Sequence, residues 1–125
     1  MAWISGNRYL SKSEMENNAL IIKNYLTSKG WTLNAIAGIL GNMESESTIN
    51  PGIWQSLNAG NMSGGFGLGQ WTPATNYTDW ADDQGISWSD GNAQLKWIDE
   101  QTTGRVSSGR MVCRSPAPPS RAGTE

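Results

Sequence analysis

The stretch GILGNMESES, residues 38–47, places two carboxyl groups, Glu44 and Glu46, at the end of a segment with a helical stripe of apolar residues. Cleavage of a glycosidic bond requires a carboxylic acid that protonates the departing oxygen, and apolar neighbours keep such a group protonated near neutral pH. At about 100° per residue, the two glutamates fall on opposite flanks of the stripe. Helical phase alone leaves both as candidates for the acid, and a pair of solvated glutamates at a helix end would give the same pattern.

A second group of residues that could bind a ligand is GFGLGQWTP, residues 65–73. Its glycines allow a ligand to approach the backbone closely, and the Gln70 amide offers a donor and an acceptor to sugar hydroxyl or N-acetyl groups. The spacing lacks the Lys-Ser/Thr pair of a phosphate-binding loop. Taken by itself, the pattern is also typical of a structural turn.

The composition excludes several other kinds of chemistry. The chain has no His, so the usual Ser/His and Cys/His nucleophile pairs and the commonest zinc ligand sets are not available. Cys113 is the single cysteine, which rules out an intramolecular disulfide. A formal net charge of -2 argues against binding to nucleic acid. We therefore expect no cofactor and no metal, and we expect acid chemistry to depend on carboxylates.

Two further features of the sequence bear on the ligand and the compartment. Seven Trp in 125 residues is a high number, and aromatic faces stack on sugar rings as well as filling cores. The N-terminal residues have no long apolar region, and the apolar run AIAGIL is too short to span a bilayer. We expect neither a signal peptide nor insertion into a membrane.

Two helices are predicted in the first half of the chain. The first covers residues 13–29, with a capping box at Ser13–Glu16 and Gly30 at its C-terminal end. The second starts at Thr32 as N-cap, carries an apolar stripe and ends near Ser47, ahead of an Asn-Pro-Gly turn signal. The predicted stripe consists of Leu33, Ile36, Ile39, Leu40 and Met43.

The second half is predicted to be more irregular. Residues 54–73 are rich in Gly, Asn and Ser, which indicates loops and a small β-hairpin. Two short helices are predicted at residues 75–83 and 90–103, the second capped by Asp90. After Gly104, the Arg, Pro and Ser content predicts a disordered tail over residues 104–125.

Taken together, GILGNMESESTINPGIWQ and GFGLGQWTP closely resemble the phage tail lysozyme family, in particular the N-terminal muramidase domain of tail-tip peptidoglycan hydrolases of small Bacillus podoviruses. A supporting match lies in YLSKSEMENNALIIKNYLTSKGWT, and the resemblance covers roughly residues 5–100. It implies an α+β, mainly α, lysozyme-like fold in which a catalytic helix and a small β-hairpin line a cleft.

The resemblance also implies roles for particular residues. The glutamate of the E-S-x-x-N-P-G stretch is the family's catalytic acid, and it corresponds to Glu46, which makes Glu44 a flanking residue. The GxGLxQW element lines the other side of the family's cleft. The substrate-binding residues expected from this correspondence, with Tyr77 added as an aromatic candidate, are Gly67, Leu68, Gln70, Trp71 and Tyr77.

A second carboxylate is harder to find in the sequence. A nucleophile or a base would lie about 5 to 9.5 Å from the acid. Asp79, Asp82 and Asp83 are candidates by sequence order alone, and solvation at the surface is the expected fate of each. An enzyme with one essential glutamate, assisted by the substrate's own acetamido or hydroxyl group, is the other route.

The expected function is cleavage of the bond between N-acetylmuramic acid and N-acetylglucosamine in peptidoglycan, by a virion tail that acts from outside on the bacterial wall. Expected partners are glycan strands and other phage tail proteins. Family members continue with further helices, so we expect a domain over residues 1–103 that is incomplete at its C-terminal end, with impaired activity as one consequence. The alternatives are a lytic transglycosylase, a non-catalytic module in which Trp54, Trp71 and Tyr77 hold the sugar, and a gene remnant.

Overall fold

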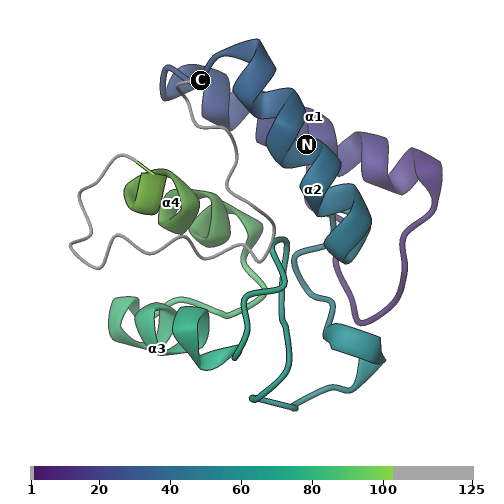
Figure 1. The fold of residues 1–125 in the computed structure, drawn as a ribbon, viewed down its shortest axis with the longest axis vertical. Helices are drawn as coiled ribbons and strands as arrows, with labels where there is room; N and C mark the ends of the chain where they lie inside the picture. The colour runs from purple at the N-terminus through teal and green to yellow at the C-terminus, as the bar shows by residue number, and fades with distance from the viewer. Residues whose placement is uncertain (1, 103–125) are drawn as a thin grey trace.

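The computed structural model describes residues 2–102, and within this range the fold consists of helices and loops. The helices are α1 (Lys12–Ser28), α2 (Leu33–Ser47), a short 3-10 turn η1 (Gln55–Leu57), α3 (Thr75–Gln84) and α4 (Gly91–Thr102). Figure 1 shows α1 and α2 beside one another, α3 and α4 on the other side, and the teal segment after α2 connecting the two halves. The expected tail over residues 104–125 lies outside the described residues.

The four predicted helices are confirmed, with one change at the start of α1. Its N-cap is Ser11, whose hydroxyl accepts from the Glu14 backbone N–H while the Glu14 carboxylate accepts from the Ser11 N–H. The capping box predicted at Ser13 is therefore wrong by two residues. The sequence offers the Ser-x-x-Glu pattern in both registers, and a bidentate ion pair between Arg8 and Glu14 selects the earlier one.

The Arg8–Glu14 pair makes the stability of this helix end dependent on pH. The hydrogen bonds from Arg8, and then that from Ser11, lower the pKa of Glu14 from 4.5 to about 2. A depressed carboxyl pKa contributes stability above the unfolded value, and that contribution is lost as the pH falls toward the folded value. We expect Glu14→Gln to destabilise the chain at neutral pH, with the deficit shrinking between pH 4.5 and about 2.

Urea unfolding of both chains at several pH values measures this difference, and Glu16→Gln, at an exposed glutamate of the same helix, is the control. A deficit that stays constant over the window would contradict the proposed linkage.

The other helix ends largely follow the sequence signals. The Thr32 hydroxyl accepts from the Ala35 N–H at the start of α2, and the Asp90 carboxylate accepts from the Asn92 and Ala93 N–H groups at the start of α4. Leu33 departs from the predicted apolar stripe, because its side chain is 66% exposed. It occupies the first position of α2, next to the N-cap Thr32.

The predicted β-hairpin is wrong, because the described residues contain isolated bridges in place of strands. Phe66 pairs with Trp54 and with Trp71 in antiparallel bridges, each confined to a single residue pair. The glycines around Phe66 bring no side chains that could extend the ladder by cross-strand packing, and the chain turns tightly at Gly67 and Gln70. Of the expected α+β, mainly α, fold, the mainly helical part is confirmed and the β part is not.

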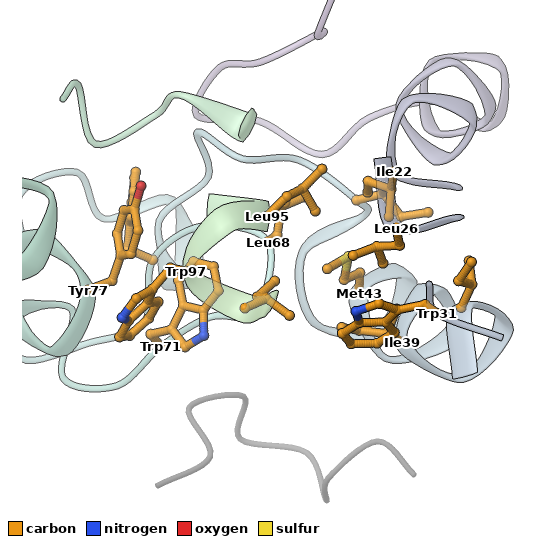
Figure 2. Packing of buried hydrophobic residues seen from close by; sticks show 14 of the residues in the cluster. Ile22, Leu26, Trp31, Ile39, Met43, Leu68, Trp71, Tyr77, Leu95 and Trp97 are labelled. Atoms are coloured by element: carbon orange, nitrogen blue, oxygen red, sulfur yellow. The ribbon is translucent and has the colours of Figure 1, made fainter. Parts of the chain in front are cut away.

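The core joins these elements through two groups of side chains that meet in the middle (Figure 2). The first group consists of aliphatic residues of α1 and α2 with Met43 and Trp31, whose indole N–H donates to Asp99 of α4, and the second consists of aromatic rings from the Gly-rich loop, α3 and α4. Leu68 and Leu95 lie between the two groups in Figure 2. In Figure 2 the labelled members of the first group are Ile22, Leu26, Trp31, Ile39 and Met43, and those of the second are Trp71, Tyr77 and Trp97.

Candidate active site

The two glutamates of α2 line different pockets. Glu46, in the last turn of the helix, is half-buried and lines a pocket whose other walls come from the loops that follow. Glu44 is exposed and lines a separate pocket on the α1 side of α2. The remaining residues around the Glu46 pocket are Tyr9, Ser45, Ile53, Trp54, Gln55, Ser56, Gln70 and Thr72.

The residue next to Glu46 connects the helix end to the Gly-rich loop. Ser47 is buried, and its hydroxyl lies 3.0 Å from the Met43 carbonyl oxygen and 2.8 Å from the Leu68 carbonyl oxygen. The first contact is the usual bond of a helical serine to its own turn, and the second crosses to the loop. The position of Glu46 is therefore coupled directly to that of the Gly-rich loop.

Gln94 of α4 holds the same loop from the other side. Its side chain is fully buried, and its amide oxygen accepts from the Leu68 N–H at 2.9 Å. Its amide nitrogen donates to the Pro51 carbonyl at 2.8 Å and to the Trp88 carbonyl at 2.9 Å. A single amide thus fixes the Gly-rich loop, the turn after α2 and the loop before α4, and it satisfies buried backbone groups in each.

Asn50, from the Asn-Pro-Gly turn, fixes the N-terminal segment against the pocket. Its buried amide donates to the carbonyls of Gly6 and Arg8, both at 2.7 Å, and its oxygen accepts from the Gly52 N–H at 2.9 Å. The Thr48 hydroxyl accepts from the Leu10 N–H at 3.0 Å. The residues around Tyr9 are consequently held by the segment that directly follows Glu46.

Gln70 borders the pocket in a strained backbone conformation. Its φ of +50° lies in the left-handed region, and its side-chain nitrogen donates to the carbonyls of Ile53 at 3.1 Å and Gly67 at 3.0 Å. These bonds fix the amide in place while the residue still borders the pocket. The described residues contain five non-glycine positions with positive φ, and all of them lie between residues 48 and 70. Strain of this kind concentrates at functional sites.

Gly67 is a position where both the backbone and the space require glycine. Its φ is +84°, and a Cβ atom there would lie 2.8 Å from the Trp71 ring and 2.9 Å from the Gln94 oxygen. Gly60 has the same φ of +84° with no atom within 4 Å of such a Cβ.

The difference between Gly60 and Gly67 predicts that alanine lowers the free energy of unfolding by different amounts at the two positions. Gly60→Ala should lose about 1 kcal/mol through backbone strain alone, and Gly67→Ala should lose about 2 kcal/mol more through overpacking. Urea unfolding measures both free energies. Equal losses would contradict the close packing of Gly67 against Trp71 and Gln94.

The site residues predicted from the sequence divide into those that line the Glu46 pocket and those that do not. Glu46 and Gln70 line the pocket, as does Trp54. Gly67, Leu68, Trp71 and Tyr77 are buried and are not among its lining residues. Trp71 stacks on Tyr77 with ring centroids 5.0 Å apart, and burial, with a smaller contribution from Asp90, raises the pKa of Tyr77.

The three aspartates considered as a second carboxylate lie elsewhere. Asp79, Asp82 and Asp83 are exposed on α3, and the Asp82 carboxylate accepts from the Trp88 indole N–H at 2.8 Å. None of them lines the Glu46 pocket. Within residues 2–102, Glu46 is the acidic side chain that borders this pocket.

Sequence reasoning missed the residues that build the site. Ser47, Asn50 and Gln94 supply its fixed hydrogen bonds, and Tyr9 forms part of its rim. Gln94 carried a detectable signal, because it precedes Trp97 and Ile98 by three and four residues and so shares the apolar face of its helix. A polar residue on such a face indicates a buried hydrogen bond.

Across the described range, no helix has both the length and the apolar character needed to cross a membrane. The same range contains no group of three or more His, Cys, Asp or Glu side chains that could hold a metal ion.

A half-buried glutamate at a helix end thus borders an open pocket together with Gln70 of the Gly-rich loop. The model of the phage tail lysozyme family matches residues 17–122, and the chain belongs to this family. Among individual proteins, it is similar to Morphogenesis protein 1 of Bacillus phage B103, with 61% identity over 94 residues. The aligned region covers 75% of this chain and 26% of that relative, so the chain spans about a quarter of the relative's length.

Proposed function

We propose that the chain cleaves the glycan strands of peptidoglycan as a muramidase, with Glu46 as the general acid. The observation that carries the proposal is the placement of the two glutamates: Glu46 borders the pocket formed with the Gly-rich loop, and Glu44 does not. Membership of the phage tail lysozyme family supports a glycosidase. The bond proposed for cleavage joins N-acetylmuramic acid to N-acetylglucosamine.

In the proposed reaction, the Glu46 carboxyl donates its proton to the glycosidic oxygen as the bond to the anomeric carbon breaks. Water then adds to that carbon, which gives a new reducing end and returns a proton to the site. The half-buried position of Glu46 shields the carboxyl from bulk water on one side while the pocket admits the sugar. Ser47 fixes the acid relative to the loop on which the glycan would lie.

We assign different roles to the residues of the Gly-rich loop and its neighbours. Gln70 and Trp54 border the pocket and would contact the glycan directly. The buried Gly67, Leu68, Trp71 and Tyr77 would act indirectly, by fixing the conformation of the loop: the Gly67 carbonyl accepts from the Gln70 side chain, and Trp71, the next residue, stacks on Tyr77.

The biological setting we propose is a phage tail that penetrates the cell wall during infection. The family is described as a tail lysozyme, and the relative from phage B103 carries the name of a morphogenesis protein, which fits a component of the virion. The proposed partners are peptidoglycan outside the cell and other proteins of the tail.

The experiment that tests the reaction class uses purified peptidoglycan whose stem peptides have been removed. A muramidase should release soluble fragments and reducing ends from this glycan-only material. Release from intact peptidoglycan alone would instead indicate cleavage in the peptides. Binding without any release would favour a non-catalytic glycan-binding module, for which Trp54 in the pocket wall is the supporting observation.

A further inference from the structure

Tyr9 is the aromatic residue with the most exposed side chain in the described part of the chain, at 62%, and it lies at the rim of the Glu46 pocket. It precedes residues 17–122, the range that the family model matches, so that match assigns it no role. An exposed aromatic ring beside a pocket offers a flat apolar face with a hydroxyl at one edge.

The backbone on both sides of Tyr9 is fixed, although its ring is exposed. The carbonyls of Gly6 and Arg8 accept from the Asn50 amide, and the Leu10 N–H donates to the Thr48 hydroxyl. Leu10 is buried. The ring is therefore carried by a rigid segment, which lowers the conformational entropy that a ligand would have to remove.

The same segment is also hydrogen-bonded to the loop that carries Trp54, another residue of the pocket wall. The Asn7 side chain accepts from the Trp54 N–H at 3.0 Å and donates to the Leu57 carbonyl at 2.8 Å. Asn7 thus joins the segment that carries Tyr9 to the loop that carries Trp54, and both aromatic residues border one pocket with Glu46. A glycan combines flat apolar ring faces with polar edges, and the aromatic and amide side chains that border this pocket suit a ligand of that class.

We propose that Tyr9 stacks on a sugar ring of the glycan strand next to the ring held at Glu46, and so contributes affinity at the rim of the pocket. This inference depends on the proposed glycan substrate. Tyr9 makes no contribution to bond cleavage itself, because the acid is supplied by Glu46. Its substitution should therefore weaken binding and leave the chemical step intact.

The test measures binding of an N-acetylglucosamine oligomer to the full chain in the Glu46→Gln background, so that hydrolysis does not interfere. An aromatic contact is worth about 0.5–1.5 kcal/mol, which converts to a rise in Kd of about 2- to 13-fold for Tyr9→Ala. Tyr9→Phe should keep most of the affinity, because it retains the ring face. Leu33→Ala, at an exposed apolar residue that does not line the pocket, is the matched control.

In the chain with Glu46 intact, Tyr9→Ala should raise KM on the glycan and leave kcat within about twofold. In the binding experiment, a folded Tyr9→Ala variant with the same Kd as the chain that keeps Tyr9 would overturn the inference and leave the proposed function standing. A parent chain that binds no oligomer would count against both the inference and the glycan substrate. A drop in kcat equal to the drop in kcat/KM would also overturn it, because stacking on the neighbouring ring is proposed to contribute affinity and not to change the chemical step.

Discussion

Glu46→Gln is expected to lower the rate of glycan cleavage by about 100- to 10,000-fold, since the amide cannot donate the proton that a general acid supplies. The substitution keeps the size and shape of the side chain at a half-buried position of the last turn of α2. We therefore expect the free energy of unfolding to change little. Release of reducing ends from purified glycan strands, at equal concentrations of verified folded protein, measures the effect.

Glu44→Gln is the matched control for this prediction. Glu44 lies two residues earlier on the same helix, is exposed, and borders the pocket on the α1 side. It should retain nearly full activity. Comparable losses in the two variants would show that net charge at the helix end matters more than the pocket, which would argue against the role assigned to Glu46.

Gln94→Glu is expected to have the largest effect on stability. The substitution places a carboxylate oxygen where the amide nitrogen now donates to the carbonyls of Pro51 and Trp88. Each buried group left without its partner costs about 1–3 kcal/mol, so we expect a loss of at least about 3 kcal/mol. Since the same amide holds Leu68 in the Gly-rich loop, activity should fall even at temperatures where the variant remains folded.

Gln84→Glu makes the same chemical change at an exposed position near the end of α3, and it serves as the control. Its effect should stay within about 0.5 kcal/mol, as is usual for surface substitutions. Gln94→Met removes the hydrogen bonds without adding charge and should also destabilise the chain. Gln94 variants as stable as Gln84→Glu in urea unfolding would contradict the role of Gln94 as the link between three loops.

The sequence was sufficient to predict the helices because their signals are local. Apolar periodicity and the caps at Thr32 and Asp90 depend on neighbours within one or two turns. The hairpin prediction failed because β-pairing depends on side chains across the ladder, and glycines around Phe66 provide none. The start of α1 was misplaced because Arg8, which lies outside the helix, decides between two equivalent capping registers.

The site was only partly predictable for a related reason. Glu46 and Gln70 were identified through the resemblance of their motifs, and helical phase alone did not distinguish Glu46 from Glu44. The contacts that build the pocket join residues far apart in sequence, such as Gln94 with Leu68 and Asn50 with Arg8. No local pattern specifies such pairs. Burial likewise separates Trp71 from Trp54, although both are aromatic residues close to the Gly-rich loop.

The most direct test of the central claim is mass spectrometry of the fragments released from purified peptidoglycan by the parent chain and by Glu46→Gln. The proposed function predicts fragments with N-acetylmuramic acid at the new reducing end from the parent, and release by the variant that is slower by at least about 100-fold. Fragments with anhydro ends would identify a transglycosylase that uses the same pocket. No fragments from a folded parent, or equal release by both chains, would contradict the claim that Glu46 cleaves the glycan.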